Sequence, residues 1–393
     1  MANAKESLSV RVYEDYNTTA LEDDLSESWL SMVFSTGLHG GFKEARLSVP
    51  MALDAAWQYL NRPGAAGRHF HHLEISDGID VVWEGRIMDI ELLVQSGFVG
   101  LNLTSFGYWS SMRDQYYDAA DAGNTDWTAG GPHTVDDIIK EMITKECPDI
   151  NGTADIEANT RDVVGIDLTD RGYPMDIIVD KIAPLSDSDN SVWYFGVWES
   201  RKPYWTKRNT DDINWYLSVE DTERLSLNQQ GKHLRNVVLP VVGTAEKTSS
   251  VDTDSTALYP RREVMLSLPS GIADAVANDA GKTALEERKD PRQDQGFTVK
   301  GHVYNTTPGR LSQAAGAGVE EKPKWWVRAG DVARIRDLVS EAAASGTLDD
   351  LRTFYLVETR YDAGRDVLEV QPDRPNNRLS VLLSRMSQLE KDK

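Results

Sequence analysis

The segment GIDVVWEGRIMDIELLVQSGFVGLNLTSFGYW, from Gly78 to Trp109, has the most regular pattern in the chain. Ser76-Asp77-Gly78 supplies a turn at its start, because glycine adopts positive φ without a steric penalty. Gly97 turns the chain again, and over Val99–Thr104 apolar and polar residues alternate. A period of two residues is typical of a strand with one buried face. The segment therefore predicts consecutive strands joined by turns, and with them a sheet or a barrel.

Trp83, Glu84 and Arg86 allow a second interpretation of the same segment. Sugar-cleaving sites often use these residue types, and glycoside hydrolysis needs two carboxylates that face each other across a bond. The chain has 63 acidic residues, so some pair is always available and the count identifies no site. Gly85 interrupts the register, which predicts a bulge or a close backbone approach. We interpret the segment as barrel wall, with Glu84 and Arg86 on one strand face, placed to pair across strands or subunits.

The composition indicates a globular protein of two or three domains. Of its 393 residues, 40% are hydrophobic and 27% charged, as in chains with packed cores. No apolar run reaches the roughly 20 residues that cross a bilayer, and the N-terminus lacks the apolar stretch of a secretory signal. Cys147 is the only cysteine, which excludes an internal disulfide and favours synthesis in a reducing cytosol. We expect Cys147 to be a small apolar residue at the end of a helix.

The formal net charge of −21 restricts the possible partners. Such a surface repels phosphate, so sequence-specific nucleic acid binding is not expected. A protein past which DNA slides without adhering is compatible with this charge. The acidic clusters, such as Glu22-Asp23-Asp24, are short, and an ordinary solvated surface also explains them.

The residues before the opening segment also follow strand patterns. Ser7–Tyr13, Leu30–Leu38 and Phe42–Pro50 are rich in alternating, β-branched or aromatic residues. Met51–Leu60 predicts one short helix, closed by the turn residues Arg62-Pro63-Gly64. The N-terminal part is therefore predicted to be almost entirely β.

The middle of the chain changes to helical patterns. Thr134–Glu146 carries an apolar stripe at helical spacing, with Thr134 as the N-cap and Asp137 completing a capping box. Shorter helices are predicted at Tyr108–Ala122 and Met175–Ile182. Together these patterns predict an α/β insert of about 80 residues, an ordinary size for a small module.

The remaining part mixes strands, loops and helices. It predicts strands at Ser191–Ser200, Asp211–Val219 and Phe297–Tyr304, a hairpin turned by Ala363-Gly364, a mobile loop or lid at Gly243–Ser255, a helical pair at Ser270–Arg288 and a loop at Gly309–Gly318. Asp331–Val339 fits both a strand and a helix. A strand, turn, strand theme thus occurs near Gly78 and again near Gly364, on either side of the helical insert.

Three histidines form a candidate metal site. In an extended strand His69 and His71 share a face, next to His72, and two imidazoles can bind a metal. No third ligand cluster accompanies them and Cys147 stands alone, so we expect no metal and no cofactor. The sequence also has no nucleophile elbow, phosphate-binding glycine loop, HExxH motif or dinucleotide fingerprint.

Aromatic and basic residues gather in Trp193–Trp205 and just after it. Tryptophans in strands serve most often in cores or interfaces. Arg201-Lys202 and Lys207-Arg208, interleaved with Tyr204 and Trp205, resemble a strip that binds nucleic acid. In so acidic a chain we expect these basic residues to pair with carboxylates of a neighbouring subunit.

Three groups of segments follow one another in a characteristic order. The first is LSMVFSTGLHGGFKEARLSVP (Leu30–Pro50) followed by HHLEISDGIDVVWEGRIMDIEL (His71–Leu92), the second SFGYWSSMRDQYY followed by TVDDIIKEMI, and the third VRAGDVARIRDL followed by TFYLVETRYDAGRDVLEV. Their order resembles the hub, or minor tail, proteins of tailed bacteriophages. The first group is similar to the family's N-terminal β-barrel, the second to its passage into a helical insert and the third to its closing barrel strands.

The resemblance implies a mainly β fold with α/β insertions (α+β), made of two tail-tube-like β-barrels and a helical insert domain. The implied domains are a first barrel at 1–108, an α/β insert at 109–190 and a second barrel at 191–393. A further helical and loop insertion is expected around 270–318.

The resemblance also implies a structural, non-enzymatic virion protein at the tail tip, assembled in the host cytoplasm. Three subunits of such hubs form a ring. Each subunit has two related barrels, so the ring presents six barrels to the sixfold tail tube. The implied partners are the tail tube protein, a distal tail ring protein, tail-tip, fibre or spike proteins and the tape-measure protein. An acidic channel lining would keep DNA from adhering during ejection.

Two alternatives belong to other functional classes. One is a tail-associated cell-wall or polysaccharide hydrolase that uses Glu84 and a partner carboxylate. The other is a carbohydrate-binding module at the tail tip, built on exposed tryptophans.

Overall fold

The computed structural model describes most of the chain. The described residues are 4–14, 16, 21–56, 71–95, 98–121, 123–127, 133–159, 161, 166, 168, 171–185, 192–208, 213–223, 234–286, 288–289, 296–306, 320–336 and 353–372. The predicted loop at Gly309–Gly318, the turn at Gly97 and His69 lie outside them.

Strands dominate the described residues, as the sequence predicts. The N-terminal strands are β1 (Leu8–Tyr13), β2 (Leu21–Asp24), β3 (Ser31–Gly37), β4 (Gly40–Pro50), β5 (His72–Asp77), β6 (Asp80–Gln95) and β7 (Phe98–Phe106). The later strands are β8 (Trp193–Trp198), β9 (Lys202–Lys207), β10 (Trp215–Ser218), β11 (Thr222–Glu223), β12 (Val237–Val242), β13 (Ala245–Glu246), β14 (Ser250–Val251), β15 (Glu263–Leu268), β16 (Phe297–Val299), β17 (Val303–Asn305), β18 (Glu320–Lys322), β19 (Val332–Arg336), β20 (Thr353–Asp362) and β21 (Val367–Pro372).

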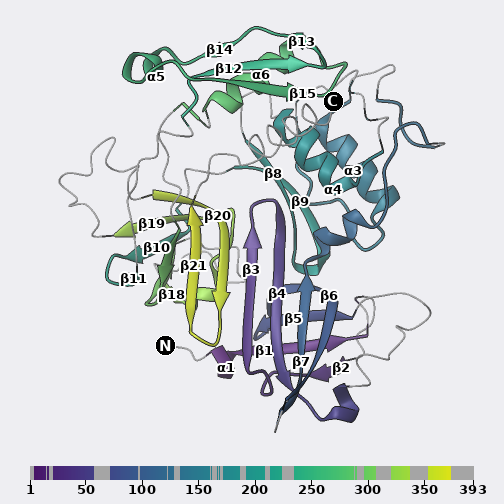
Figure 1. The fold of residues 1–393 in the computed structure, drawn as a ribbon, viewed down its shortest axis with the longest axis vertical. Coiled ribbons are helices and arrows are strands. Elements are labelled where there is room, and N and C mark those ends of the chain that lie inside the picture. Colours follow the sequence, from purple (N-terminus) through teal and green to yellow (C-terminus); the bar gives the residue numbers. More distant parts are fainter. Residues whose placement is uncertain are drawn as a thin grey trace.

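One long sheet joins strands from both ends of the chain. Its N-terminal part runs in the order β2, β1, β5, β6, β7, β4, β3 and curls into a half-barrel at the bottom of Figure 1. Strand β3 then pairs antiparallel with β20, which continues through β21 and β16 to β11. Strand β20 also pairs with β19, which leads to β10, β17 and β18. The fold is therefore mostly β, and its first and last strands belong to the same sheet.

Local signals predicted the two hairpins correctly. Strands β5 and β6 are joined at Gly78, whose φ of +62° is the left-handed conformation that glycine tolerates. Strands β20 and β21 are joined across Ala363 and Gly364, where Asp366 has φ +49°. Asp331–Val339, ambiguous in the sequence, contains strand β19.

Gly85 is a point of close backbone approach and not a bulge. The register shifts beside Val82, between Ile75 and Ser76 of β5, and at Met88, between Ile87 and Asp89. A Cβ on Gly85 would lie 2.4 Å from the carbonyl oxygen of Phe106 in β7. The missing side chain therefore permits tight packing, while the bulges lie elsewhere on the strand.

The predicted helix at Thr134–Glu146 is confirmed as α3 (Val135–Glu146), whose N-terminus has the capping box of Thr134 and Asp137. The helix predicted at Met175–Ile182 is also present, as α4 (Pro174–Asp176) followed by the π-helical turn η3 (Ile177–Ile182) and the 3₁₀ turn η4 (Ala183–Leu185). The remaining short elements are α1 (Ala4–Ser7), η2 (Tyr108–Arg113), η5 (Glu199–Arg201), α5 (Thr253–Leu258), α6 (Asp274–Glu286) and η7 (Lys324–Trp326). No helix among the described residues is both long and apolar enough to span a bilayer.

One predicted helix in the first half of the chain is shorter than expected. The helix predicted at Tyr108–Ala122 ends as η2, because Tyr117 instead pairs its backbone with Gly172. Of the helix predicted at Met51–Leu60, residues 53–56 are helical, and 57–60 lie outside the described residues.

Two predictions in the region 243–288 are wrong for a common reason. The predicted loop or lid at Gly243–Ser255 supplies β13 and β14, which pair with β12, and Asp252 caps α5 through the N–H of Ser255 at 2.7 Å. The predicted helical pair at Ser270–Arg288 is the single helix α6. Gly281 lies inside α6, where a Cβ would meet Pro240 at 2.6 Å, so this glycine serves packing and does not end a helix. Tertiary contacts overrode the local composition at both places.

The single strand predicted at Phe297–Tyr304 is divided into β16 and β17. The backbone N–H groups of Lys300 and Gly301 both donate to the carbonyl oxygen of Asp221, which bends the chain between the two strands. A side chain at Gly301 would overlap Asp221, because its Cβ would lie 1.6 Å from Oδ1.

Two hydrophobic clusters form the core. One fills the long sheet and unites residues from Leu8 to Val370. The other packs α3, η3 and α6 against the aromatic ribbon of β8 and β9, and Figure 1 shows these elements above the half-barrel. Strand β8 belongs to the long sheet through its parallel pairing with Gly40 and Gly41 of β4. The β8–β9 ribbon is thus a place where the two cores meet.

Candidate functional site: a polar junction at the turn between β8 and β9

Glu84 lies at this meeting point, on the face of β6 opposite to Trp83. Its side chain is only 4% exposed, and Glu74 of β5 is directly opposite in the ladder. Glu84 Oε1 accepts a 2.6 Å hydrogen bond from the backbone N–H of Arg201, in the turn η5 between β8 and β9. The carboxyl group of Glu84 therefore fastens this turn to the sheet.

The turn has an unusual backbone conformation. Ser200 and Arg201 have φ values of +59° and +58°, although neither is a glycine. Such left-handed residues cost free energy unless their surroundings hold them. The N–H group of Arg201 donates to Glu84 Oε1 inside this turn. The buried acceptor helps to hold the turn in its strained conformation.

The pKa of Glu84 is raised to about 7, chiefly by burial and in smaller part by the nearby charge of Glu74. The N–H groups of Arg201 and Ser200 and the Arg201 charge act in the opposite direction. Burial dominates because removing a carboxylate from water penalises its charged form strongly. Burial therefore favours the protonated form of Glu84.

The side chain of Arg201 ties the turn to two further segments. Its guanidinium lies 3.9 Å from the ring centroid of Tyr16 and 5.8 Å from that of Tyr108. Arg201 Nη1 donates to the carbonyl oxygen of Asp149 at 2.9 Å, and the backbone oxygen of Arg201 accepts from Asn151 N at 3.0 Å. We call the group formed by Glu84, Tyr108, Asp149 and the turn Glu199–Arg201 the junction.

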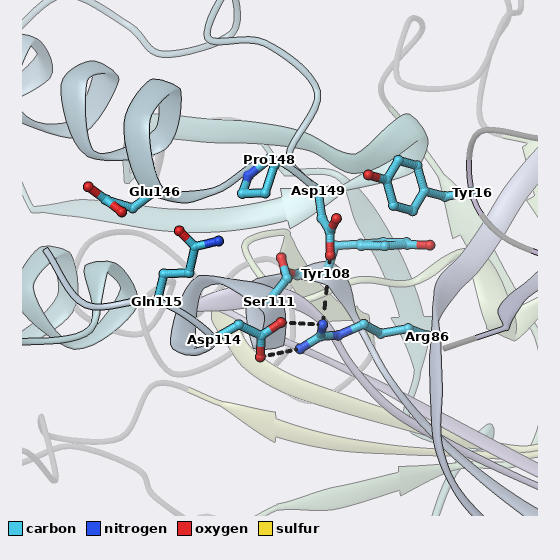
Figure 2. Close-up of a pocket in the computed structure, with 9 residues that line it drawn as sticks. All are labelled: Tyr16, Arg86, Tyr108, Ser111, Asp114, Gln115, Glu146, Pro148 and Asp149. Carbon is cyan, nitrogen blue, oxygen red and sulfur yellow. Dashed lines mark hydrogen bonds and ion pairs between the residues drawn. The ribbon is translucent and has the colours of Figure 1, made fainter. Parts of the chain in front are cut away.

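Arg86, two residues after Glu84 on the same face, forms an ion pair beside the junction. Its guanidinium binds Asp114 through two hydrogen bonds of 2.5 and 3.0 Å, and Asp149 Oδ2 lies 3.7 Å away. These groups border a pocket of about 210 Å³, shown in Figure 2. The pocket is lined by Tyr16, Arg86, Tyr108, Ser111, Asp114, Gln115, Glu146, Pro148 and Asp149.

This arrangement suits contacts that fasten segments of the chain to one another better than it suits hydrolysis of a glycosidic bond. A glycosidase presents two carboxylates across an open space that holds the scissile bond. Here the guanidinium of Arg86 lies between Asp114 and Asp149 (Figure 2). The carboxylate of Glu84 faces the backbone of a turn, not the pocket lining. Glu84 and Arg86 thus have partners within the chain, in turns and not in neighbouring strands, and their pairing across subunits stays a prediction.

Replacing Asp114 by alanine should destabilise the protein by about 1–3 kcal/mol, because the side chain of Arg86 is only 5% exposed and would lose both hydrogen bonds to this carboxylate. Urea unfolding monitored by tryptophan fluorescence measures this loss. Asp121→Ala, which removes an exposed carboxylate from a surface ion pair with Arg171, is the matched control and should change stability by less than about 0.5 kcal/mol. Equal effects of the two changes would contradict this assignment.

The histidines of the candidate metal site have structural contacts. His71 and His72 are buried, and His72 Nδ1 lies 2.7 Å from the hydroxyl of Tyr108. Within the part of the chain that the structure describes, no three His, Cys, Asp or Glu side chains are grouped to hold a metal ion. The absence of a metal at His69 and His71 stays a prediction, because His69 is outside that part. Cys147 is buried at the end of α3.

The aromatic and basic stretch is an internal element. Trp193 and Trp205 stack with ring centroids 5.3 Å apart, and both are almost fully buried, which removes them as a sugar-binding surface. The basic residues that follow have partners in the same chain: Lys207 lies over Trp193, and Arg208 lies 4.0 Å from the ring centroid of Tyr355. Their pairing with a neighbouring subunit stays a prediction.

Sequence reasoning missed the residues that hold the turn from its other side. Arg328 donates to Glu199 Oε2 at 2.9 Å and to the carbonyl oxygen of Val81 at 2.7 Å. Its guanidinium also lies over the rings of Phe42 and Trp198. These contacts join residues more than 100 positions apart, and no local pattern marks them. The junction therefore connects the N-terminal sheet, the middle of the chain and the C-terminal segment.

Comparison with known proteins extends this picture to the whole fold. The sequence matches no family model and no curated relative. Its structure is similar to the 43 kDa tail protein of prophage MuSo2 from Shewanella oneidensis, with a TM-score of 0.56 at 10% identity over 94% of this chain and 97% of that one. It is also similar to the tail protein from Neisseria meningitidis MC58, with a TM-score of 0.58 at 12% identity and the same coverage. The resemblance inferred from the sequence is confirmed in the fold: the chain has the fold of phage tail proteins.

Proposed function

We propose that the chain is a structural tail hub of a phage virion. In this role it joins the tail tube to the tip or receptor-binding apparatus. The observation that carries the proposal is the fold similarity to two phage tail proteins over nearly the whole length of both chains. Fold similarity alone does not define a function, but here both neighbours are tail components and the polar junction suits a structural role.

The proposed assembly is a homotrimeric ring at the distal end of the tail. Each subunit contributes two related barrels, with 1–108 and 191–393 as the barrel domains and 109–190 as the insert. The proposed partners are the tail tube protein, a distal tail ring protein, tip, fibre or spike proteins and the tape-measure protein. The pairing of β3 with β20 supports this proposal, because it joins strands of 1–108 and of 191–393 in one continuous sheet.

In the proposed ring, the acidic surface has a role in DNA ejection. Adhesion of proteins to DNA comes from Lys and Arg contacts to phosphate. With a net charge of −21, the chain presents few such contacts relative to its carboxylates. The ring would form part of the ejection channel without retaining DNA and without enzymatic activity.

Mass measurement and electron microscopy of the purified chain test the proposal. We expect a mass three times that of the 43.8 kDa chain and a ring with threefold symmetry. Measurement at several concentrations, and with purified tail tube protein added, separates a trimer that forms alone from one that forms on the tail. A compact monomer under all these conditions would argue against the hub.

A further inference from the structure

We propose that the junction is a proton-linked latch. Proton uptake by Glu84 favours docking of the Glu199–Arg201 turn onto β6, and proton loss favours its release. The inference goes beyond the proposed role in the tail, because it concerns a conformational equilibrium within one chain.

The geometry couples docking of the turn to the burial of Glu84. In the docked state its carboxyl group is buried and accepts the backbone N–H of Arg201, in a turn with two left-handed residues. If the turn leaves, Glu84 becomes exposed to water and the turn loses the acceptor that compensates its strain. Docking and burial of Glu84 are therefore the same event.

Charged and titratable groups face Glu84 from every element packed around it. Glu74 of β5 opposes its ionisation, and Arg201 of the turn favours it. The phenol of Tyr108 in η2 has a raised pKa, chiefly through burial and then through the Glu84 charge. Asp149 and Arg86 act on the same phenol with opposite signs, and His72 bonds to its hydroxyl. The local negative charge therefore exceeds what Arg201 and Arg86 neutralise.

The sign of the linkage follows from burial. The docked state holds the Glu84 proton with a pKa of about 7, while an exposed glutamate has the ordinary value of 4.5. Because the docked state binds the proton more tightly, docking is strongest below pH 4.5 and weakens as the pH rises to 7. Two-state linkage between these values predicts that the opening equilibrium constant increases about 70-fold from pH 5 to pH 8.

Hydrogen exchange of the full-length protein between pH 5 and pH 8 measures this opening. Protection factors, corrected for the intrinsic exchange rates, are followed in peptides that cover Trp198–Lys202, with helix α3 as an internal reference. In the wild type we expect protection of the turn to fall about 70-fold relative to α3 across this range. Glu84→Gln mimics the protonated side chain and should keep the turn protected at all pH values. Glu91→Gln, an exposed change on the same strand, should behave like the wild type.

Two results would overturn the latch. One is a wild-type turn whose corrected protection does not change with pH, a result that holds even if the Glu84→Gln variant misfolds. The other is the same pH dependence in a folded Glu84→Gln variant, which would assign the titration to a different group such as His72. Circular dichroism and thermal unfolding establish whether each variant is folded. Neither result depends on whether the chain forms a trimer, so a failure of the latch and a failure of the hub proposal remain distinguishable.

Discussion

Replacement of Gly41 by alanine is expected to prevent the formation of a stable, soluble protein. Gly41 has φ +75° and pairs in parallel with Val197 of β8. A Cβ at this position would lie 2.1 Å from the carbonyl oxygen of Val197, and both groups belong to rigid backbone. The change must separate β4 from β8 or distort both, and we expect a loss above about 4 kcal/mol. Soluble yield and urea unfolding measure it.

Gly78→Ala is the matched control for this prediction. Gly78 also has a positive φ, of +62°, but a Cβ there would meet nothing within 4 Å. Only the left-handed conformation is then penalised, at about 1–2 kcal/mol. A Gly41→Ala protein as stable as the Gly78→Ala protein would show that β4 and β8 do not approach as closely as described.

Replacement of Asp77 by alanine is the change with the second largest expected effect. Asp77 Oδ2 accepts hydrogen bonds from the indole N–H groups of both Trp325 and Trp326, each at 3.0 Å. Both tryptophans are buried, so the change leaves two donors without this acceptor. An unsatisfied buried donor costs about 1–3 kcal/mol, which predicts a total loss of about 2–5 kcal/mol. The midpoint of urea unfolding, at unchanged slope, reports the effect.

Two further variants separate the hydrogen bonds from the charge of Asp77. Asn retains an acceptor oxygen, so Asp77→Asn should lose much less stability than Asp77→Ala. Asp80→Ala removes a carboxylate from the other side of the same turn and should change stability by less than about 1 kcal/mol. Asp77→Asn and Asp77→Ala proteins of equal stability would show that the indole contacts contribute little.

Local signals in the sequence predicted much of the secondary structure. The capping box at Thr134 and the apolar stripe behind it predicted α3, because both depend on residues within one or two helical turns. The turn at Gly78 and the alternation around it predicted β5 and β6 for a similar reason. Predictions failed where a distant residue decided the outcome, as at Gly281, which packs against Pro240, and at Gly301, which packs against Asp221.

The candidate site shows the same division between local and distant information. The alternation of β6 predicted that Glu84 and Arg86 share a face, but their partners in the structure are Arg201 and Asp114, which lie in turns and not in neighbouring strands. It could not identify the partners, because Arg201 and Asp114 approach only through the fold. The backbone turn that donates to Glu84 carries no recognisable sequence motif, because its left-handed residues are a serine and an arginine. The two-barrel division and the trimer stay proposals.

The pairing of β3 with β20 has a consequence for the synthesis of the chain. The hydroxyls of Thr36 and Thr359, which are 323 positions apart, lie 2.7 Å from each other across this pairing. Contacts of such long range form late and slow the folding of a chain. While the C-terminal part is still on the ribosome, β3 presents an open strand edge, and open edges promote aggregation. A truncated subunit would keep that edge exposed, so only a complete chain closes its sheet and can enter an assembly with a finished surface.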